Sequence, residues 1–153
     1  MRDIKFRAYL KEYKVVVKVL TIDFEDKDIT FESDEIEEWG NCVDFDDAIL
    51  MKNIGLKDKN GVEMFEGDIV RSYDCDDNEC IDFIVYNPYC QAFVLENVKE
   101  FNNPWGIEST TSIYDCADVD RGLMQDGVPY TDNFEIIGNV YVNPELLEGT
   151  NND

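Results

Sequence analysis

Carboxylates and thiols are the residues best placed to do chemistry in this chain, because it contains no histidine. The acidic run at residues 74–82 puts oxygen ligands at positions 1, 3, 5 and 9 of the calcium-loop template. Two constrained positions of that template differ, since Glu79 replaces its glycine and Val85 replaces its bidentate glutamate. An acidic hairpin loop is therefore the favoured interpretation, and a calcium site is the alternative.

The cysteines offer a second candidate metal centre. Cys75 and Cys80 form one loose pair, and with Cys90 and Cys116 they would supply the thiolates of a zinc site. Such sites generally contain two close pairs with short spacers, and Cys42 makes the number of cysteines odd. We expect reduced thiols that pack as small apolar residues, and no cofactor.

Catalysis finds little support in the sequence. A serine or cysteine nucleophile needs a base beside it, and the usual base, histidine, is missing. Among 35 acidic residues some pair of carboxylates must lie close, so a metal-dependent hydrolase remains an alternative without specific support. The chain also lacks a glycine-rich phosphate loop and the common hydrolase motifs. The sequence predicts a protein that is not an enzyme.

Charge is the most unusual property of the chain, which carries 35 acidic and 13 basic residues for a net charge of -22. Such a surface repels nucleic acids and anionic membranes, and suits a basic protein partner. Residues 1–22 hold six basic and two acidic side chains, whereas residues 23–47 hold twelve acidic side chains and only Lys27. A homo-oligomer that joins these two segments across subunits is the alternative.

A partner-binding surface is predicted where acids and large aromatics share irregular segments, because aromatic anchors and charged rims are typical of interfaces. The competing interpretation is that these rings hold the loops on the core. The predicted partner-binding residues are Asp34, Glu35, Glu37, Glu38, Trp39, Asp44, Asp46, Asp47 and Trp105.

Short alternating and β-branched runs predict a chain of strands. The predicted strands cover residues 4–9, 14–24, 29–32, 49–53, 69–73, 81–86, 92–98 and 134–141. Residues 55–70 predict a hairpin, with Asn60-Gly61 in the first turn and Glu66-Gly67 in the second. Gly138 lies inside the last strand and indicates a bulge or a close backbone approach.

Helix is predicted only in two short pieces. Ser33 is the expected cap of a helix that runs to Glu37, and Asn143 is the expected cap of a turn with Pro144 at its first position. So many short strands indicate a mainly β fold, either an antiparallel curled sheet or a small barrel. Residues 99–133 form a long loop-rich insertion.

Three blocks of the sequence resemble the YopX family of phage and prophage proteins. They are MRDIKFRA at the start, GLKDKNG with FEGDIV in the middle, and FEIIGNVYVNPELL near the end. The resemblance implies a single YopX-like domain at residues 1–148, with an SH3-like barrel core at about 49–98 plus 134–147 and a flexible tail at 149–153. It supplies no catalytic residues, because the family's role is itself uncharacterised.

These observations predict a phage or prophage accessory protein that binds a host or phage protein through an acidic surface. No apolar run is long enough to cross a membrane, and the first residues lack the apolar core of a signal peptide. We expect the protein in the cytoplasm of the bacterial host.

Overall fold

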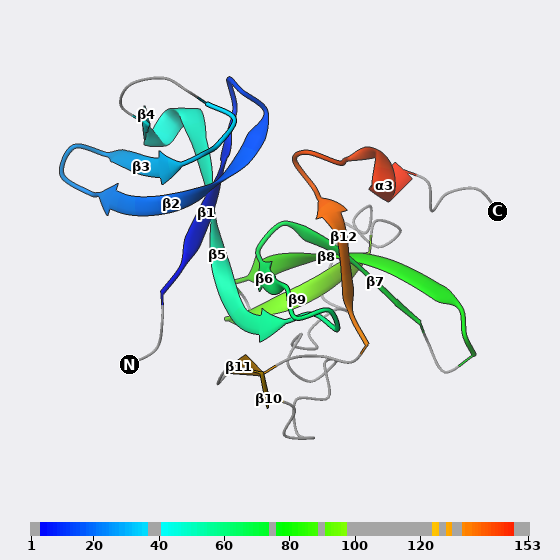
Figure 1. Cartoon of the computed structure of the whole chain (residues 1–153). Helices are drawn as coiled ribbons and strands as arrows, with labels where there is room; N and C mark the ends of the chain where they lie inside the picture. Colours follow the sequence, from blue (N-terminus) through cyan, green and yellow to red (C-terminus); the bar gives the residue numbers. More distant parts are fainter. Residues whose placement is uncertain are drawn as a thin grey trace. The chain divides into compact units, whose positions relative to one another are not determined.

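The computed structural model describes residues 4–36, 41–73, 76–88, 91–97, 124–125, 128–129 and 133–148 (Figure 1). The chain divides into two compact units, Met1–Asn53 and Ile54–Asp153. Antiparallel strands make up most of both units, so the prediction of a mainly β fold is confirmed. The prediction of one YopX-like domain over residues 1–148 stays a prediction, and residues 149–153 lie outside the described part.

The first unit is a run of neighbouring strands in the order β4-β3-β2-β1-β5. Every predicted strand of this unit is present, and the short β4 was not predicted. The elements are β1 (Phe6–Leu10), β2 (Val15–Asp23), β3 (Asp28–Glu32), β4 (Cys42–Asp44), the 3-10 helix η1 (Phe45–Asp47) and the first part of β5 (Ala48–Lys57).

Alternation along these strands builds the core of the first unit. Ala8 and Leu10 of β1 are buried with Val17 of β2, while Arg7 and Tyr9 point to the opposite face. Ile29 and Phe31 of β3 complete the buried cluster. The predicted alternation therefore holds, although Ile4 lies before β1 and is exposed.

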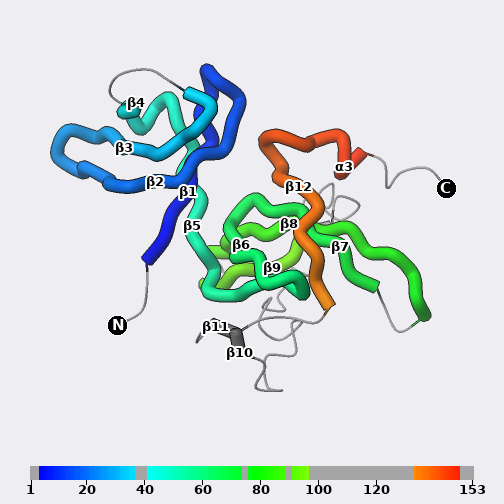
Figure 2. The backbone as a smooth tube through the Cα atoms, viewed as in Figure 1, coloured from blue at the N-terminus to red at the C-terminus, as the bar shows by residue number. Residues whose placement is uncertain are grey.

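The first unit curls strongly, and the hydrogen bonds of η1 show it. Phe45 N–H donates to Lys27 O at 2.9 Å, and two residues later Asp47 O accepts from Lys11 N–H at 3.0 Å. Lys27 and Lys11 lie in turns at opposite ends of β2, which would span about 27 Å if its nine residues were straight. The short η1 can join both turns only because the sheet bends (Figure 2).

A β-bulge in β2 supplies part of this bend. The register between β2 and β3 shifts between Val19 and Thr21, so that Leu20 is the extra residue. A bulge bends its strand and increases the local twist. It also turns the Leu20 side chain outwards, where it is more than half exposed.

The second unit contains a separate sheet in the order β12-β7-β8-β9 (Figure 1). The final residues of β5 and the short β6 belong to the same unit. Its elements are β6 (Glu63–Phe65), β7 (Asp68–Tyr73), β8 (Glu79–Asn87), β9 (Ala92–Asn97), β10 (Met124–Gln125), β11 (Val128–Pro129), β12 (Glu135–Asn139) and α3 (Glu145–Glu148). Its core consists of Ile54, Leu56, Met64, Val70, Ile84, Phe93 and Phe134.

Both sheets are open in the described ranges, because each strand order has two end strands. Of the two predicted architectures, the curled antiparallel sheet is therefore confirmed and the closed SH3-like barrel is not found. Of the predicted insertion at residues 99–133, the structure describes only the small ladder between β10 and β11. The rest of that insertion lies outside the described residues.

The helix predicted from Ser33 is wrong in its described part. Residues 33–36 form a bend, and Ser33 Oγ accepts the Glu35 N–H at 3.2 Å. The hydroxyl thus acts as predicted towards a nearby N–H, but it closes a short local turn instead of starting a helix. Ile36 then packs against the core of the first unit, and Glu37 lies outside the described residues.

The hairpin predicted at residues 55–70 is confirmed, and a buried carboxylate fixes it. Asp58 is 1% exposed, and its Oδ1 accepts the N–H groups of Asn60 and Val62, both at 2.9 Å. Its Oδ2 accepts the N–H of Ile136 in β12 at 3.1 Å. Asp58 therefore closes its own turn and attaches the turn to a strand 78 residues away.

Gly138 shows both features that the sequence indicated. The register between β12 and β7 shifts between Ile136 and Gly138, which is the predicted bulge. A Cβ at Gly138 would lie 2.7 Å from Leu146 Cδ1 and 2.9 Å from Asn143 Oδ1. The turn before α3 therefore packs directly on the glycine backbone. Asn143 does not cap α3 with its side chain as predicted, because its Oδ1 accepts the Asn139 N–H.

Replacing Asp58 should destabilise the protein strongly. Asp58→Ala leaves three N–H groups without their buried acceptor, and we expect a loss of about 3 kcal/mol or more in the free energy of unfolding. Urea unfolding measures this loss. Asp58→Asn should lose less because one amide oxygen remains, and the exposed Asp26→Ala should change stability by less than about 0.5 kcal/mol. A loss under about 1 kcal/mol for Asp58→Ala would contradict the assignment.

Two glycines should respond to alanine for different reasons. Gly138→Ala meets Leu146 and Asn143, so we expect a loss of about 1–3 kcal/mol, part of which Leu146→Ala relieves in the double variant. Gly55→Ala meets nothing within 4 Å but keeps a φ of 82°, so about 1 kcal/mol is expected. Urea unfolding of the double variant discriminates, because additive losses would show that the side chains do not collide.

Candidate functional site

Three carboxylates form one cross-strand row on the first unit. Asp23 of β2 pairs with Asp28 of β3, and Asp28 pairs with Asp44 of β4. The neighbouring row, Ile22, Ile29 and Val43, belongs to the core. Since successive residues of a strand point to opposite faces, the three carboxylates lie on the outer face. We call Asp23, Asp28 and Asp44 the acid row.

The hydrogen-bond pattern brings two of these carboxylates close together. Printed bonds join Phe31 to Asn41 and Phe45 to Lys27, which identifies these as hydrogen-bonded pairs. Because the two kinds of pair alternate, Asp28 and Asp44 form a non-hydrogen-bonded pair, with Cα atoms about 4.5 Å apart. Like charges directly opposite each other destabilise a strand pair. The acid row is therefore a feature that folding alone does not favour.

The described residues do not neutralise the acid row. Their ion pairs lie elsewhere, and the lysine nearest in sequence, Lys27, makes none with it. Asp23 Oδ1 accepts the N–H groups of Glu25 and Asp26, so this carboxylate also shapes the β2–β3 turn. The row thus keeps its negative charge exposed to solvent.

The acid row does not converge on a metal-binding point. Neighbouring strands lie about 4.8 Å apart, so the three carboxylates spread along a line. Within the described ranges no group of three or more Asp, Glu or Cys side chains has a geometry that could hold a metal ion. The predicted calcium-type loop is described only from Asp76, since Asp74 and Cys75 lie outside the described residues, as do Cys90 and Cys116.

Cys42 of β4 lies beside the acid row. Desolvation raises the pKa of its thiol, and a hydrogen bond with Asp28 and the charges of Asp28 and Asp44 raise it further. A raised pKa lowers the thiolate fraction, so the site suppresses the nucleophilic form of this cysteine. Neither Cys42 nor Cys80 is in a disulfide, as expected for these two thiols.

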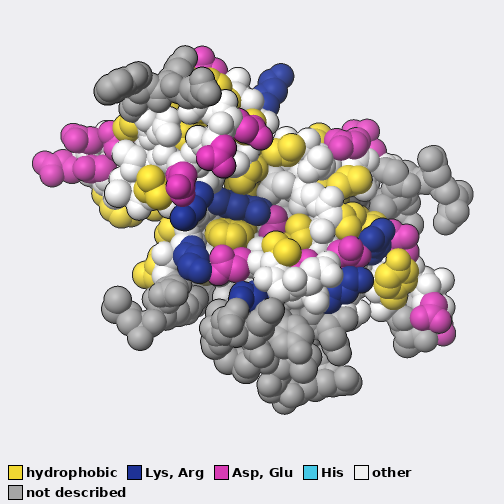
Figure 3. Space-filling view, viewed as in Figure 1, with side chains coloured by type: hydrophobic (Ala, Val, Ile, Leu, Met, Phe, Trp, Pro, Cys, Tyr) yellow, Lys and Arg dark blue, Asp and Glu magenta, His cyan; other side chains and the backbone are white. Residues whose placement is uncertain are grey.

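An exposed aromatic ring adjoins the acid row. Phe24 follows Asp23 directly and is 77% exposed, and its ring meets Phe45 edge to face with centroids 6.2 Å apart. Phe45 follows Asp44 directly and packs on the core. We call the acidic tip the set Asp23, Phe24, Glu25, Asp26, Asp28, Asp44, Phe45 and Asp46. Figure 3 shows acidic side chains gathered at the end of this unit where Figure 1 places the β2–β3 turn.

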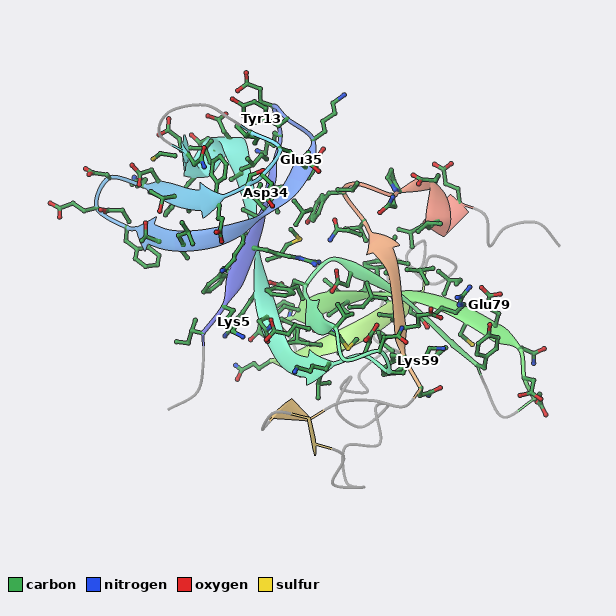
Figure 4. All side chains as sticks on the ribbon, viewed as in Figure 1. Lys5, Tyr13, Asp34, Glu35, Lys59 and Glu79 are labelled. Atoms are coloured by element: carbon green, nitrogen blue, oxygen red, sulfur yellow. The ribbon has the colours of Figure 1, made fainter. Side chains whose placement is uncertain are left out.

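The structure separates the predicted partner-binding residues into two places. Asp44, Asp46 and Asp47 lie in β4 and η1, next to the β2–β3 turn. Asp34 and Glu35 follow the opposite end of β3, and Figure 4 shows them near Tyr13 of the β1–β2 turn. The remaining predicted residues, Glu37, Glu38, Trp39 and Trp105, lie outside the described residues. The binding role of the whole set stays a prediction.

Sequence reasoning missed Asp23, Phe24 and Asp28 as candidate site residues. The signal was present, because the strands before and after residues 25–28 were predicted and a tight turn between them sets Asp23 opposite Asp28. Asp44 could not be added to the row in the same way, because β4 was not predicted.

A second charged cluster lies on the other unit and is already internally matched. Arg71 Nη2 of β7 donates to Glu135 Oε2 of β12 at 2.8 Å, and Lys59 Nζ lies 3.4 Å from the same oxygen. Arg71, and then Lys59, hold the pKa of Glu135 below its usual value, and Glu135 raises the pKa of Arg71. This cluster supports the attachment of the Asp58 turn to β12.

Chemical modification of Cys42 should report the charge of the acid row. Asp28→Asn removes a charge and a hydrogen-bond partner that raise the thiol pKa, so Cys42 should alkylate faster with iodoacetamide at mildly alkaline pH. Peptide mass spectrometry measures the rate at this cysteine. Asp34→Asn is the matched control and should leave the rate unchanged. An equal rate in Asp28→Asn and the native protein would show that Asp28 does not control the thiol.

Comparison with known proteins places the fold in a family. None of the helices in the described ranges is long and apolar enough to cross a membrane. No curated protein matches the chain. The crystal structure of protein EF1440 from Enterococcus faecalis is similar, with 25% identity over 96% of this chain and 99% of that one, and a TM-score of 0.58. The YopX protein family matches residues 5–148. With this match over most of its length, the chain belongs to the YopX family.

Proposed function

We propose that this YopX-family chain is a non-enzymatic accessory protein of a phage or prophage, and that it binds a basic protein in the cytoplasm of the bacterial host. The acid row carries the proposal. It concentrates negative charge on an exposed sheet face, and the described residues provide no cation to match it.

The energetics of the acid row support binding. Repulsion between Asp28 and Asp44 raises the free energy of the unbound protein. A positively charged partner would replace this repulsion with charge-assisted hydrogen bonds, so the unfavourable term disappears when the complex forms. Electrostatic complementarity of this kind mainly speeds association and excludes wrong partners.

The shape of the acid row favours a protein over other cationic partners. A small metal ion needs convergent oxygens, whereas these carboxylates lie on a line across three strands. Side chains of a basic protein can address the carboxylates one at a time. Nucleic acids are repelled by the net charge of -22.

A matched pair of variants tests the proposal by affinity capture. The tip variant Asp28→Asn/Asp44→Asn removes two charges from the acid row. The control variant Asp34→Asn/Glu35→Gln removes two charges from the same unit at the other end of β3. With immobilised full-length protein and bacterial lysate, we expect a basic protein that the native chain and the control retain and the tip variant loses.

Quantitative mass spectrometry of the retained proteins measures the outcome. Urea unfolding must first show that both variants fold. Equal retention of every protein by the tip variant and the native chain would contradict the proposal. Sedimentation of the native chain alone tests the homo-oligomer, because self-association that the tip variant abolishes would favour that alternative.

A further inference from the structure

Phe24 is the feature of the acidic tip that charge alone does not explain. Its ring is 77% exposed although it lies at the end of a strand whose apolar neighbours pack inwards. Its recorded contact is the edge-to-face arrangement with Phe45. Exposed single hydrophobic residues are common, but this ring directly follows a member of the acid row. The tip therefore offers one free aromatic surface beside carboxylates.

The chemistry of this combination distinguishes between the two basic side chains. A lysine ammonium is a compact point charge that carboxylates alone can satisfy. An arginine guanidinium is flat, stacks on aromatic rings and donates in a fork that matches carboxylates. Phe24 with Asp23, Asp28 and Asp44 supplies both a ring and carboxylates.

We infer that the acidic tip binds an arginine-containing segment of its partner, with Phe24 selecting arginine over lysine and the acid row supplying the charge match. This inference rests on the proposed function and names the chemistry of the partner. The occupant is an extended basic segment, since the carboxylates are distributed over three adjacent strands.

Binding of defined peptides tests the inference. Two synthetic peptides of equal length, spacing and charge are used, one with arginine and the other with lysine at every basic position. Fluorescence anisotropy with the full-length protein measures the dissociation constants. We expect the arginine peptide to bind about two- to fivefold more tightly, which is the range of an exposed cation–π contact.

Single variants assign the preference to its source. Phe24→Leu keeps an apolar side chain but removes the ring, so the two peptides should bind equally. Tyr73→Leu, at a half-exposed aromatic residue of the other unit, should leave the preference intact. Asp28→Asn/Asp44→Asn should weaken both peptides together. Because Phe24 is exposed, its replacement should change stability by less than about 0.5 kcal/mol.

The outcomes separate this inference from the proposed function. Equal affinity of the native protein for both peptides, or binding of neither, overturns the inference. An arginine preference that survives Phe24→Leu overturns it too. In each of these cases the proposed function stands if the tip variant still loses a basic protein from lysate, and it fails if that loss does not occur.

Discussion

The buried carboxylate of Asp58 is the interaction on which the second unit depends. A charged group in the interior is stable only when hydrogen bonds replace the water it has lost, and here three backbone N–H groups do so. Two of them belong to the turn that follows Asp58, and the third belongs to β12. One side chain thus sets a local turn and a long-range contact together.

This interaction explains why separated blocks of the sequence act together. The middle block contributes Asp58 and Lys59, and the last block contributes Phe134, Ile136 and Gly138. Lys59 N–H donates to Phe134 O at 2.9 Å, directly beside the bond from Ile136 to Asp58. Gly138 then lets the chain after β12 approach closely. The residues that carry the family resemblance in these two blocks therefore maintain the fold, and they are distinct from the acidic tip.

The acidic tip illustrates how a net charge becomes a local feature. A charge of -22 spread evenly would act mainly on solubility and long-range repulsion. Strand pairing instead sets Asp23, Asp28 and Asp44 side by side, against the interest of strand stability. The curl of the sheet, aided by the bulge at Leu20, brings η1 to the same end. Folding thus converts an average property of the chain into a surface with a definite place.

The sequence by itself determined the strands, the turns at Gly61 and Gly67, and the bulge at Gly138, because alternation, positive φ and close packing are local requirements that single residues reveal. It did not reveal the role of Asp58, which reads as an ordinary turn residue until β12 supplies the third donor. It also could not distinguish a curled sheet from a closed barrel. Only the tertiary structure decided which acids meet, because the pairing of β4 with β3 depends on long-range register and core packing that no local pattern records.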